Sequence, residues 1–215
     1  VIDDKKYKKS EKYILVDDVL ICLQELASLH RSKLACSLIA ITGSNGKTTS
    51  KELISSVLRK KYNVLSTEGN LNNHIGVPLT LLKLNKSHHF AVIEMGANHL
   101  KEIELLCEIA KPNFGIITNI GKAHIEGFGS IDNILIGKTE LYRYLDKNNG
   151  TVFVNSDDKK LSKSTYRLNS ISYGSESIYA PQITIDDIYV NIFCLGMTFK
   201  SNLIGKYQKF NIALA

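Results

Sequence analysis

Long apolar runs and closely spaced cysteines are both missing from this sequence. No apolar run approaches the roughly 18 to 20 residues of a membrane-spanning helix, and no charged-then-apolar signal segment opens the chain. The four cysteines Cys22, Cys36, Cys107 and Cys194 lie far apart without a Cys-x-x-Cys pair, which indicates neither a zinc site nor a disulfide framework. We therefore expect no membrane span, and buried free thiols in a cytoplasmic protein.

The composition is that of a folded chain with a modest excess of positive charge. Of its 215 residues, 44% are apolar and 22% are charged, which is enough to form a core and excludes wholesale disorder. At about 150 residues per domain, this length corresponds to roughly one and a half domains. The net charge of +6 suits either nucleic acid or a site for anionic small molecules such as nucleotides.

Apolar strands alternate with helical patterns along most of the chain. Continuous apolar strands separated by helices predict an α/β fold with a mostly parallel, Rossmann-like or P-loop sheet covered by helices on both faces. After residue 158 the pattern changes to short extended segments, which we expect to form an antiparallel addition to one sheet edge. The expected helices cover 17–31, 48–61, 100–110 and 131–145, with a short one from residue 78; the expected strands cover 37–42, 63–66, 89–94, 114–119 and 151–155, then 170–173, 182–185, 189–195 and 197–204.

The strongest motif is a glycine-rich loop, Thr-Gly-Ser-Asn-Gly-Lys-Thr-Thr, between a strand and a helix. Gly43 and Gly46 permit the tight turn, the backbone N–H groups face a phosphate, Lys47 supplies a charge and the Thr48 hydroxyl can ligate Mg²⁺. The motif is shortened, because the strict pattern places a glycine where Ile41 stands. We predict that it binds the phosphates of ATP; the alternative is a glycine-rich turn with an incidental lysine.

Three further charged or titratable residues belong to segments that reach the same edge. Glu94 ends a buried strand, and the carboxyl ends of parallel strands line the ligand crevice, so it is a candidate Mg²⁺ ligand or base. His124 follows the next strand and is a candidate metal ligand. Lys138 lies inside a predicted helix. Each has an ordinary alternative: a solvated carboxylate, an exposed histidine and a surface lysine.

The long loop 67–78 is rich in amide side chains that can donate and accept hydrogen bonds. Such a loop suits a polar substrate, but an ordinary Asn/Gly loop has the same composition.

Four motifs, in this order and spacing, together resemble the central domain of the Mur ligases: Thr42–Thr49, Thr67–Pro78, Ile93–His99 and Asn119–Ser130. The resemblance spans about residues 17 to 215. Within the family, the motifs match the members that join D-alanyl-D-alanine to UDP-N-acetylmuramoyl-tripeptide in peptidoglycan precursor synthesis. This implies an ADP-forming acid–amino-acid ligase that uses ATP and two Mg²⁺ ions.

The resemblance also implies a domain organisation. Residues 1–36 would be the tail of an N-terminal UDP-substrate domain with a linker helix, and 37–208 the central ATP-binding domain. Residues 209–215 would start a helix leading to a C-terminal domain. Val1 is not an initiator methionine, so we expect part of a longer protein, one that binds nucleotide but is inactive without its other domains.

By family likeness, Lys47 and Thr48 hold the β/γ-phosphates and one Mg²⁺, Glu94 ligates that ion and His124 ligates a second. Lys138 matches the lysine of a Lys-Gly-Glu pattern, here Lys-Thr-Glu, and would be carbamylated by CO₂ to an anion near the metal. We expect the change to Thr139 to leave the helix intact. The resemblance assigns the remaining nucleotide contacts to Gly43, Ser44, Asn45, Gly46, Thr49 and Asn211, the last at adenine. It assigns the acceptor substrate to Thr67, Glu68, Asn70, Asn72, Asn73 and His99.

The implied reaction activates a carboxylate as an acyl phosphate, which the amine of D-alanyl-D-alanine then attacks. Two alternatives stay open: a folylpolyglutamate-synthase-like ligase, and a nucleotide-binding module without ligase activity. Nucleic acid is not an expected partner, because no stacking aromatics accompany a basic stripe. A monomer is expected.

Overall fold

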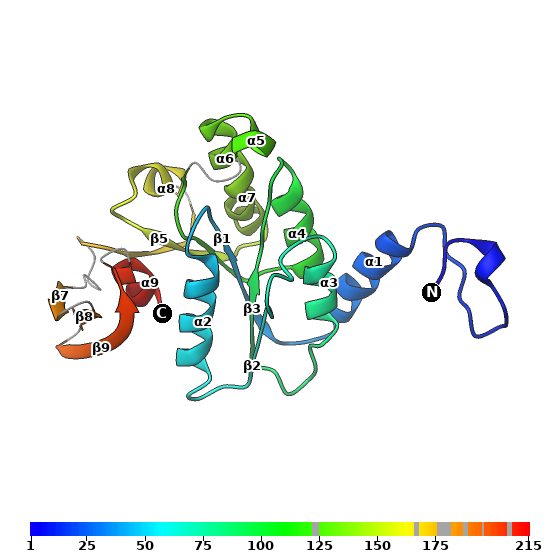
Figure 1. Cartoon of the computed structure of the whole chain (residues 1–215), viewed down its shortest axis with the longest axis horizontal. Coiled ribbons are helices and arrows are strands. Elements are labelled where there is room, and N and C mark those ends of the chain that lie inside the picture. The colour runs from blue at the N-terminus through cyan, green and yellow to red at the C-terminus, as the bar shows by residue number, and fades with distance from the viewer. Residues whose placement is uncertain (122–124, 166–167, 176–181, 187–188, 195, 206–207) are drawn as a thin grey trace.

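A six-stranded parallel sheet forms the centre of the computed structural model (Figure 1), which describes residues 1–121, 125–165, 168–175, 182–186, 189–194, 196–205 and 208–215. The strands lie in the order β2 (Val64–Ser66), β3 (Phe90–Glu94), β1 (Ser37–Thr42), β4 (Phe114–Ile117), β5 (Thr151–Asn155) and β6 (Ser170–Tyr173). The helices are α1 (Val19–Ser32), α2 (Lys47–Leu58), α3 (Gly76–Leu81), α4 (Glu102–Ala110), α5 (Ile125–Phe128), α6 (Ile131–Lys138), α7 (Glu140–Lys147), α8 (Lys159–Ser164) and α9 (Gln208–Leu214).

Strand β1 shows why these strands are apolar throughout. Its successive side chains point to opposite faces, and both faces are covered. Leu38 and Ala40 join a core formed with helices α1, α3, α4 and α7. Ile39 and Ile41 join a second core with Ile54 of α2, which the end of α9 also contacts. The predicted parallel sheet with helices on both faces is confirmed.

The order of the strands creates a ligand crevice beside β1. The chain leaves β1 on one side to build β2 and β3, then crosses to the other side to build β4, β5 and β6. In such sheets the loops on the two sides of this switch point leave in opposite directions, and a crevice forms between them outside the carboxyl ends of the strands. The loops after β1, β3 and β4 therefore meet at one edge.

The segments after residue 158 differ in part from the expected antiparallel addition to one sheet edge. Segment 170–173 joins the main sheet as β6, in parallel with β5, with Val152 opposite Ser170. The reason is helix α8, which the sequence reading missed and which is capped by the Asp158 carboxylate. A strand–helix–strand crossover returns the chain in the parallel direction. The other three segments form a separate antiparallel sheet, β7 (Gln182–Asp186), β8 (Tyr189–Cys194) and β9 (Met197–Ile204).

The helix expected over 131–145 is interrupted, so the expectation that Thr139 leaves it intact is wrong. Helix α6 ends at Lys138 and α7 begins at Glu140. The Thr139 hydroxyl donates to the carbonyls of Leu135 (2.8 Å) and Ile136 (3.1 Å). A hydroxyl that bonds to carbonyls of the preceding turn bends a helix.

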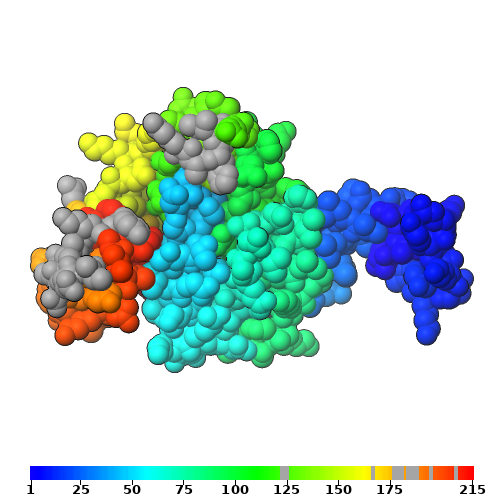
Figure 2. All heavy atoms as spheres, in the orientation of Figure 1, coloured from blue at the N-terminus to red at the C-terminus, as the bar shows by residue number. Residues whose placement is uncertain are grey.

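Residues 1–18, which include the 3-10 helix Lys5–Tyr7, precede the first α-helix and project from the body of the domain (Figure 2). Helix α1 begins where the Asp18 carboxylate accepts the N–H groups of Leu20 and Ile21. Among the described residues, no helix has the length and apolar character that crossing a membrane requires.

Candidate active site

The glycine loop after β1 adopts a backbone that only glycine accommodates easily. Gly43 has φ 140° and Gly46 has φ 78°. A Cβ on Gly43 would lie 1.9 Å from the Thr118 hydroxyl oxygen. Gly46 is the N-cap of α2 and has no side chain to cover the first turn. The loop therefore leads directly into the N-terminus of α2, whose free N–H groups favour an anion.

The end of β4 braces this loop. The Thr118 hydroxyl donates to the carbonyl of Asn45 (2.6 Å), and the Asn119 amide both donates to that carbonyl (2.8 Å) and accepts the Asn45 N–H (3.2 Å). The Ser44 hydroxyl exchanges hydrogen bonds with the backbone of Gly121. The sequence reading missed Thr118 and Asn119 as supports; polar residues at the end of a central strand are the signal that marks them.

Lys47 begins α2 and turns its ammonium back over the loop. The ammonium donates to the carbonyls of Gly43 (2.8 Å) and Ser44 (3.4 Å). Burial lowers the pKa of Lys47, and the carboxylate of Glu94 opposes part of this shift. A cation is thus held at the mouth of a loop that presents N–H groups.

The Glu94 carboxylate lies between the phosphate loop and the polar loop 67–78. It is 3% exposed, and its two oxygens accept the Thr48 hydroxyl (2.9 Å) and the Asn72 amide (2.8 Å). Glu94 and Thr48 offer a carboxylate and a hydroxyl, the hard oxygen ligands that Mg²⁺ prefers. In the described part of the chain, no cluster of three or more His, Cys, Asp or Glu side chains adds to them.

Loop 67–78 contributes fewer direct contacts than the sequence predicted. Thr67 is buried; its hydroxyl accepts the Glu94 N–H (2.9 Å) and its carbonyl accepts the buried ammonium of Lys51 (2.6 Å). Thr67 therefore supports the backbone of Glu94, and its predicted substrate contact stays a prediction. The role of Lys51 was missed, because nothing in the sequence distinguishes it from a surface lysine.

The other predicted residues of this loop differ in exposure. Glu68 forms an exposed ion pair with Lys83 (2.7 Å), and Asn70 is exposed. The Asn73 side chain accepts the N–H groups of Ile75 and Gly76 at the start of α3. Of the predicted residues 68–73, Asn72 is the one whose side chain contacts the Glu94 carboxylate at the crevice.

A cavity of about 490 Å³ separates Lys47 from the loop after β3. Its lining includes Asn72 and Asn73 from loop 67–78 and Gly96 and Asn98 from the segment after β3; the Gly96 N–H donates to the carbonyl of Asn72 (2.8 Å). His99 lies outside this lining; its exposed ring is 3.3 Å from the Glu102 carboxylate. The cavity places a polar pocket next to the cation of the phosphate loop.

A larger cavity, of about 920 Å³, lies on the other side of the loop. Its lining includes Asn45, Gly46, Thr49 and Asn211. The Ser50 hydroxyl donates to the Asn211 side chain (3.1 Å), which fixes it beside Gly46. The structure therefore brings Asn211, distant in sequence, to the phosphate loop, and its contact with adenine stays a prediction. The opposite wall comes from the loop before α8.

Lys138 is an unusual lysine, with only 1% of its surface exposed. Burial, together with the charge of Lys47, lowers the pKa of Lys138 to about 8. Its ammonium lies 5.6 Å from the centre of the Phe128 ring and makes no hydrogen bond or ion pair with another described side chain. His124, the remaining predicted ligand, lies outside the described residues.

Comparison with known proteins shows the family. The model of the Mur ligase middle domain matches residues 41–215. The chain belongs to the Mur ligase family. Its curated relatives include a UDP-N-acetylmuramoyl-tripeptide–D-alanyl-D-alanine ligase of Haemophilus influenzae, 44% identical over 165 residues, which cover 75% of this chain and 36% of the relative.

Solved structures agree with this family assignment. This Mur ligase domain is similar to MurF from Acinetobacter baumannii, with a TM-score of 0.87 and 31% identity over 96% of this chain and 48% of that one. It is also similar to MurF ligase from Thermotoga maritima in complex with ADP, with a TM-score of 0.83 and 29% identity over 96% and 50% of the two chains. The Mur ligase chain described here thus spans about a third to a half of the length of these relatives.

Proposed function

We propose that this domain is the ATP-binding centre of an ADP-forming ligase that adds D-alanyl-D-alanine to UDP-N-acetylmuramoyl-tripeptide. The observation that supports it best is the convergence of Lys47, Thr48 and Glu94 on one crevice, reached from two parallel strands. The names of the curated relatives and of the similar structures support the choice of substrates.

In this proposal the nucleotide spans the phosphate loop and the larger cavity. The N–H groups from Gly43 to Thr49 and the Lys47 ammonium receive the β- and γ-phosphates. The cavity beside Asn211 receives the adenosine, since its lining begins at the loop and its volume of about 920 Å³ exceeds that of the base and ribose. The similar Thermotoga maritima ligase was solved in complex with ADP, which supports an adenine nucleotide as the ligand.

Thr48 and Glu94 would hold one Mg²⁺, and the carbamate of Lys138 together with His124 would hold a second. When bound, the ions neutralise the phosphate charges that must approach one another. Before that, the Thr48 hydroxyl and the Asn72 amide keep the Glu94 carboxylate oriented toward the crevice.

Carbamylation of Lys138 is supported by its environment. With a pKa of about 8, roughly a tenth of the side chain is the neutral amine at pH 7, far more than for an ordinary lysine. The amine lone pair forms an N–C bond with CO₂, the electrons of one C=O π bond move onto oxygen, and one proton leaves the nitrogen for solvent. The product is an anion on a buried side chain, in place of a second cation beside Lys47.

The acceptor carboxylate would enter the smaller cavity, between Lys47 and Asn72. One of its oxygens attacks the γ-phosphorus while the bond to the β-phosphate oxygen breaks and ADP leaves. The amine of D-alanyl-D-alanine then attacks the acyl carbon, loses a proton, and expels phosphate. Lys47 stabilises the transferring phosphoryl group by its charge, and no protein nucleophile is required.

The domain proposal follows the same division as the sequence reading. Residues 37–208 form the ATP-binding domain, residues 1–36 belong to a preceding substrate domain and linker, and 209–215 lead toward a following domain. The alternatives are a nucleotide-binding module without ligase activity and a folylpolyglutamate-synthase-like ligase; the 44% identity to a UDP-N-acetylmuramoyl-tripeptide–D-alanyl-D-alanine ligase favours neither.

A substrate panel on the full-length protein tests the proposal. Phosphate release should require ATP, UDP-N-acetylmuramoyl-tripeptide and D-alanyl-D-alanine together, and the 215-residue chain alone should bind MgADP but release little phosphate. Phosphate release that depends on a folate and glutamate would favour the folylpolyglutamate-synthase-like ligase. Nucleotide binding with no acceptor dependence in the full-length protein would favour the nucleotide-binding module.

A further inference from the structure

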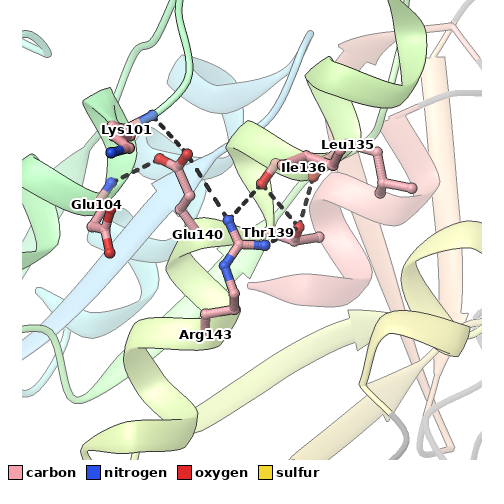
Figure 3. A network of polar contacts seen from close by, with 7 residues as sticks. All are labelled: Lys101, Glu104, Leu135, Ile136, Thr139, Glu140 and Arg143. Atoms are coloured by element: carbon pink, nitrogen blue, oxygen red, sulfur yellow. Dashed lines mark hydrogen bonds and ion pairs between the residues drawn. The ribbon is translucent and has the colours of Figure 1, made fainter.

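The carboxylate of Glu140 lies far from the phosphate loop in sequence, yet it fixes one wall of the smaller cavity (Figure 3). Glu140 begins α7 and is 5% exposed. Its two oxygens accept the backbone N–H groups of Lys101 (2.7 Å) and Glu104 (2.9 Å) in the first turn of α4. Helix α4 has no side-chain cap from its own N-cap residue, so Glu140 replaces it from another helix.

The capped turn is held in an uncommon conformation. Lys101 has φ 69°, a left-handed backbone that non-glycine residues rarely adopt. Such a residue persists only where its surroundings hold it, and these outliers gather at functional sites. The hydrogen bond from the Lys101 N–H to Glu140 is the contact that holds it.

The turn belongs to the wall of the cavity that faces Lys47. Gly96, Ala97, Asn98 and Glu102 all line this cavity. Within the segment, Glu102 accepts the N–H of Asn98 (2.6 Å), which is a local contact. Two long-range contacts hold its ends: the Gly96 N–H donates to the carbonyl of Asn72 (2.8 Å), and Glu140 accepts the N–H groups of Lys101 and Glu104 at the other end.

The same carboxylate is connected to the end of α6, where Lys138 lies. The Arg143 guanidinium lies 3.9 Å from Glu140 and donates to the carbonyl of Ile136 (3.0 Å), near the C-terminus of α6. Figure 3 shows this chain of contacts, from α4 through Glu140 and Arg143 to the break at Thr139. The wall of the cavity and the helix of Lys138 are therefore fixed relative to each other through two side chains.

We propose that Glu140 is a positioning residue, which sets the cavity wall formed by residues 96–102 and thereby the placement of the acceptor carboxylate. The role deepens the proposed function and rests on it. Because the phosphate loop makes no contact with Glu140 among the interactions described, nucleotide binding should be insensitive to its loss. Acceptor binding should be sensitive.

The test compares Glu140→Gln with wild type in the full-length ligase. The amide keeps the shape but leaves one oxygen and no charge for two N–H groups. We expect the KM for UDP-N-acetylmuramoyl-tripeptide to rise about tenfold, with the KM for ATP changed less than about twofold. Glu104→Gln is the matched control, because it removes an exposed carboxylate from the same turn and leaves the backbone N–H in place. Equal changes in both KM values, or none in either, would overturn the proposal.

Amide hydrogen exchange separates this inference from the proposed function. In the 215-residue chain, Glu140→Gln should speed exchange in peptides covering 96–104 and leave peptides of α2 unchanged. If wild type shows no ligation, the proposed function fails while this measurement still decides whether Glu140 anchors the wall. Glu140→Asp, which keeps the charge, should give an intermediate change. Exchange at 96–104 that is identical to wild type in both variants would show that Glu140 does not anchor the cavity wall.

Discussion

The Thr48 hydroxyl donates to the Glu94 carboxylate at 2.9 Å, and this bond joins the first turn of α2 to the end of β3. Strands β1 and β3 are parallel neighbours, with Ile41 opposite Glu94. The phosphate loop and the carboxylate are therefore held together by the sheet itself, and the hydroxyl sets the rotation of the carboxylate.

Lys47→Ala should weaken binding of MgADP to the chain by at least about tenfold, because a charged donor to phosphate is lost. In the full-length protein, the same change should abolish MgATP-dependent turnover. Isothermal titration calorimetry measures the first effect, with the exposed Lys60→Ala on the turn after α2 as the control. Wild-type affinity and kinetics in Lys47→Ala would remove the phosphate-loop assignment.

Lys138 should form a carbamate when CO₂ is supplied. With ¹³C-labelled bicarbonate, carbon NMR should show a carbamate signal in wild type that is absent from Lys138→Met. Since the neutral amine reacts and the pKa of Lys138 is about 8, the signal should grow as pH rises from 6.5 to about 8.5. If the carbamate signal persists in Lys138→Met, it comes from another group. If the substrate-bound full-length enzyme shows no carbamate signal, carbamylation of Lys138 is contradicted.

The unmodified lysine should also make stability depend on pH. The folded pKa of about 8 lies below the ordinary 10.5, so between these values the unfolded chain binds more protons and stability rises with pH. In CO₂-free buffer, Lys138→Met should be more stable than wild type at pH 7, by up to about 3 kcal/mol. Urea unfolding at pH 7 and pH 10 measures this; a difference that stays constant or grows toward pH 10 would refute the shift.

Gly43→Ala should destabilise the domain by roughly 2 kcal/mol or more, because the backbone has φ 140° and the Cβ would lie 1.9 Å from the Thr118 hydroxyl oxygen. Gly121→Ala is the control, since its Cβ would meet only ordinary contacts at 3.4 Å. The double variant Gly43→Ala/Thr118→Ala relieves the clash but leaves the backbone strain, so only part of the stability should return. Thermal unfolding of the three variants decides; equal stability in all of them would contradict the steric argument.

Lys51→Met should loosen the loop after β2. The Thr67 carbonyl loses a charged donor at 2.6 Å, and the hydroxyl of the same residue supports the Glu94 N–H. Exchange of the amides between residues 67 and 73 should accelerate about tenfold, while Lys60→Met leaves it unchanged. Protection equal to wild type would show that the loop is held by its other contacts.

The sheet and the convergence of loops were predictable because they follow from local patterns and one general rule. A continuous apolar strand such as 37–42 must be covered on both faces, and parallel strands end at one edge. This is sufficient to bring Lys47, Thr48 and Glu94 together. It required no knowledge of any side-chain contact.

What could not be predicted depends on contacts between distant elements. Nothing in the local sequence marks Lys51 as buried or Glu140 as the cap of another helix. The left-handed backbone of Lys101, whose N–H donates to Glu140, could not be predicted for the same reason. The break at Thr139 depends on the hydrogen bonds of its hydroxyl to the carbonyls of Leu135 and Ile136, which the helical pattern of the sequence does not show. Thr67 shows the same limit, since composition places it in a polar loop and only packing shows that it lies beneath Glu94.

The position of Asn211 has a consequence for truncation of the protein at its C-terminus. The last helix, α9, packs Leu214 against the core beside α2, and its Asn211 is fastened to Ser50. A protein ending before residue 208 would keep the whole phosphate loop and lose one side of the larger cavity. With adenosine placed beside Asn211 as proposed, such a shortened protein should still bind inorganic triphosphate but discriminate less well among nucleobases.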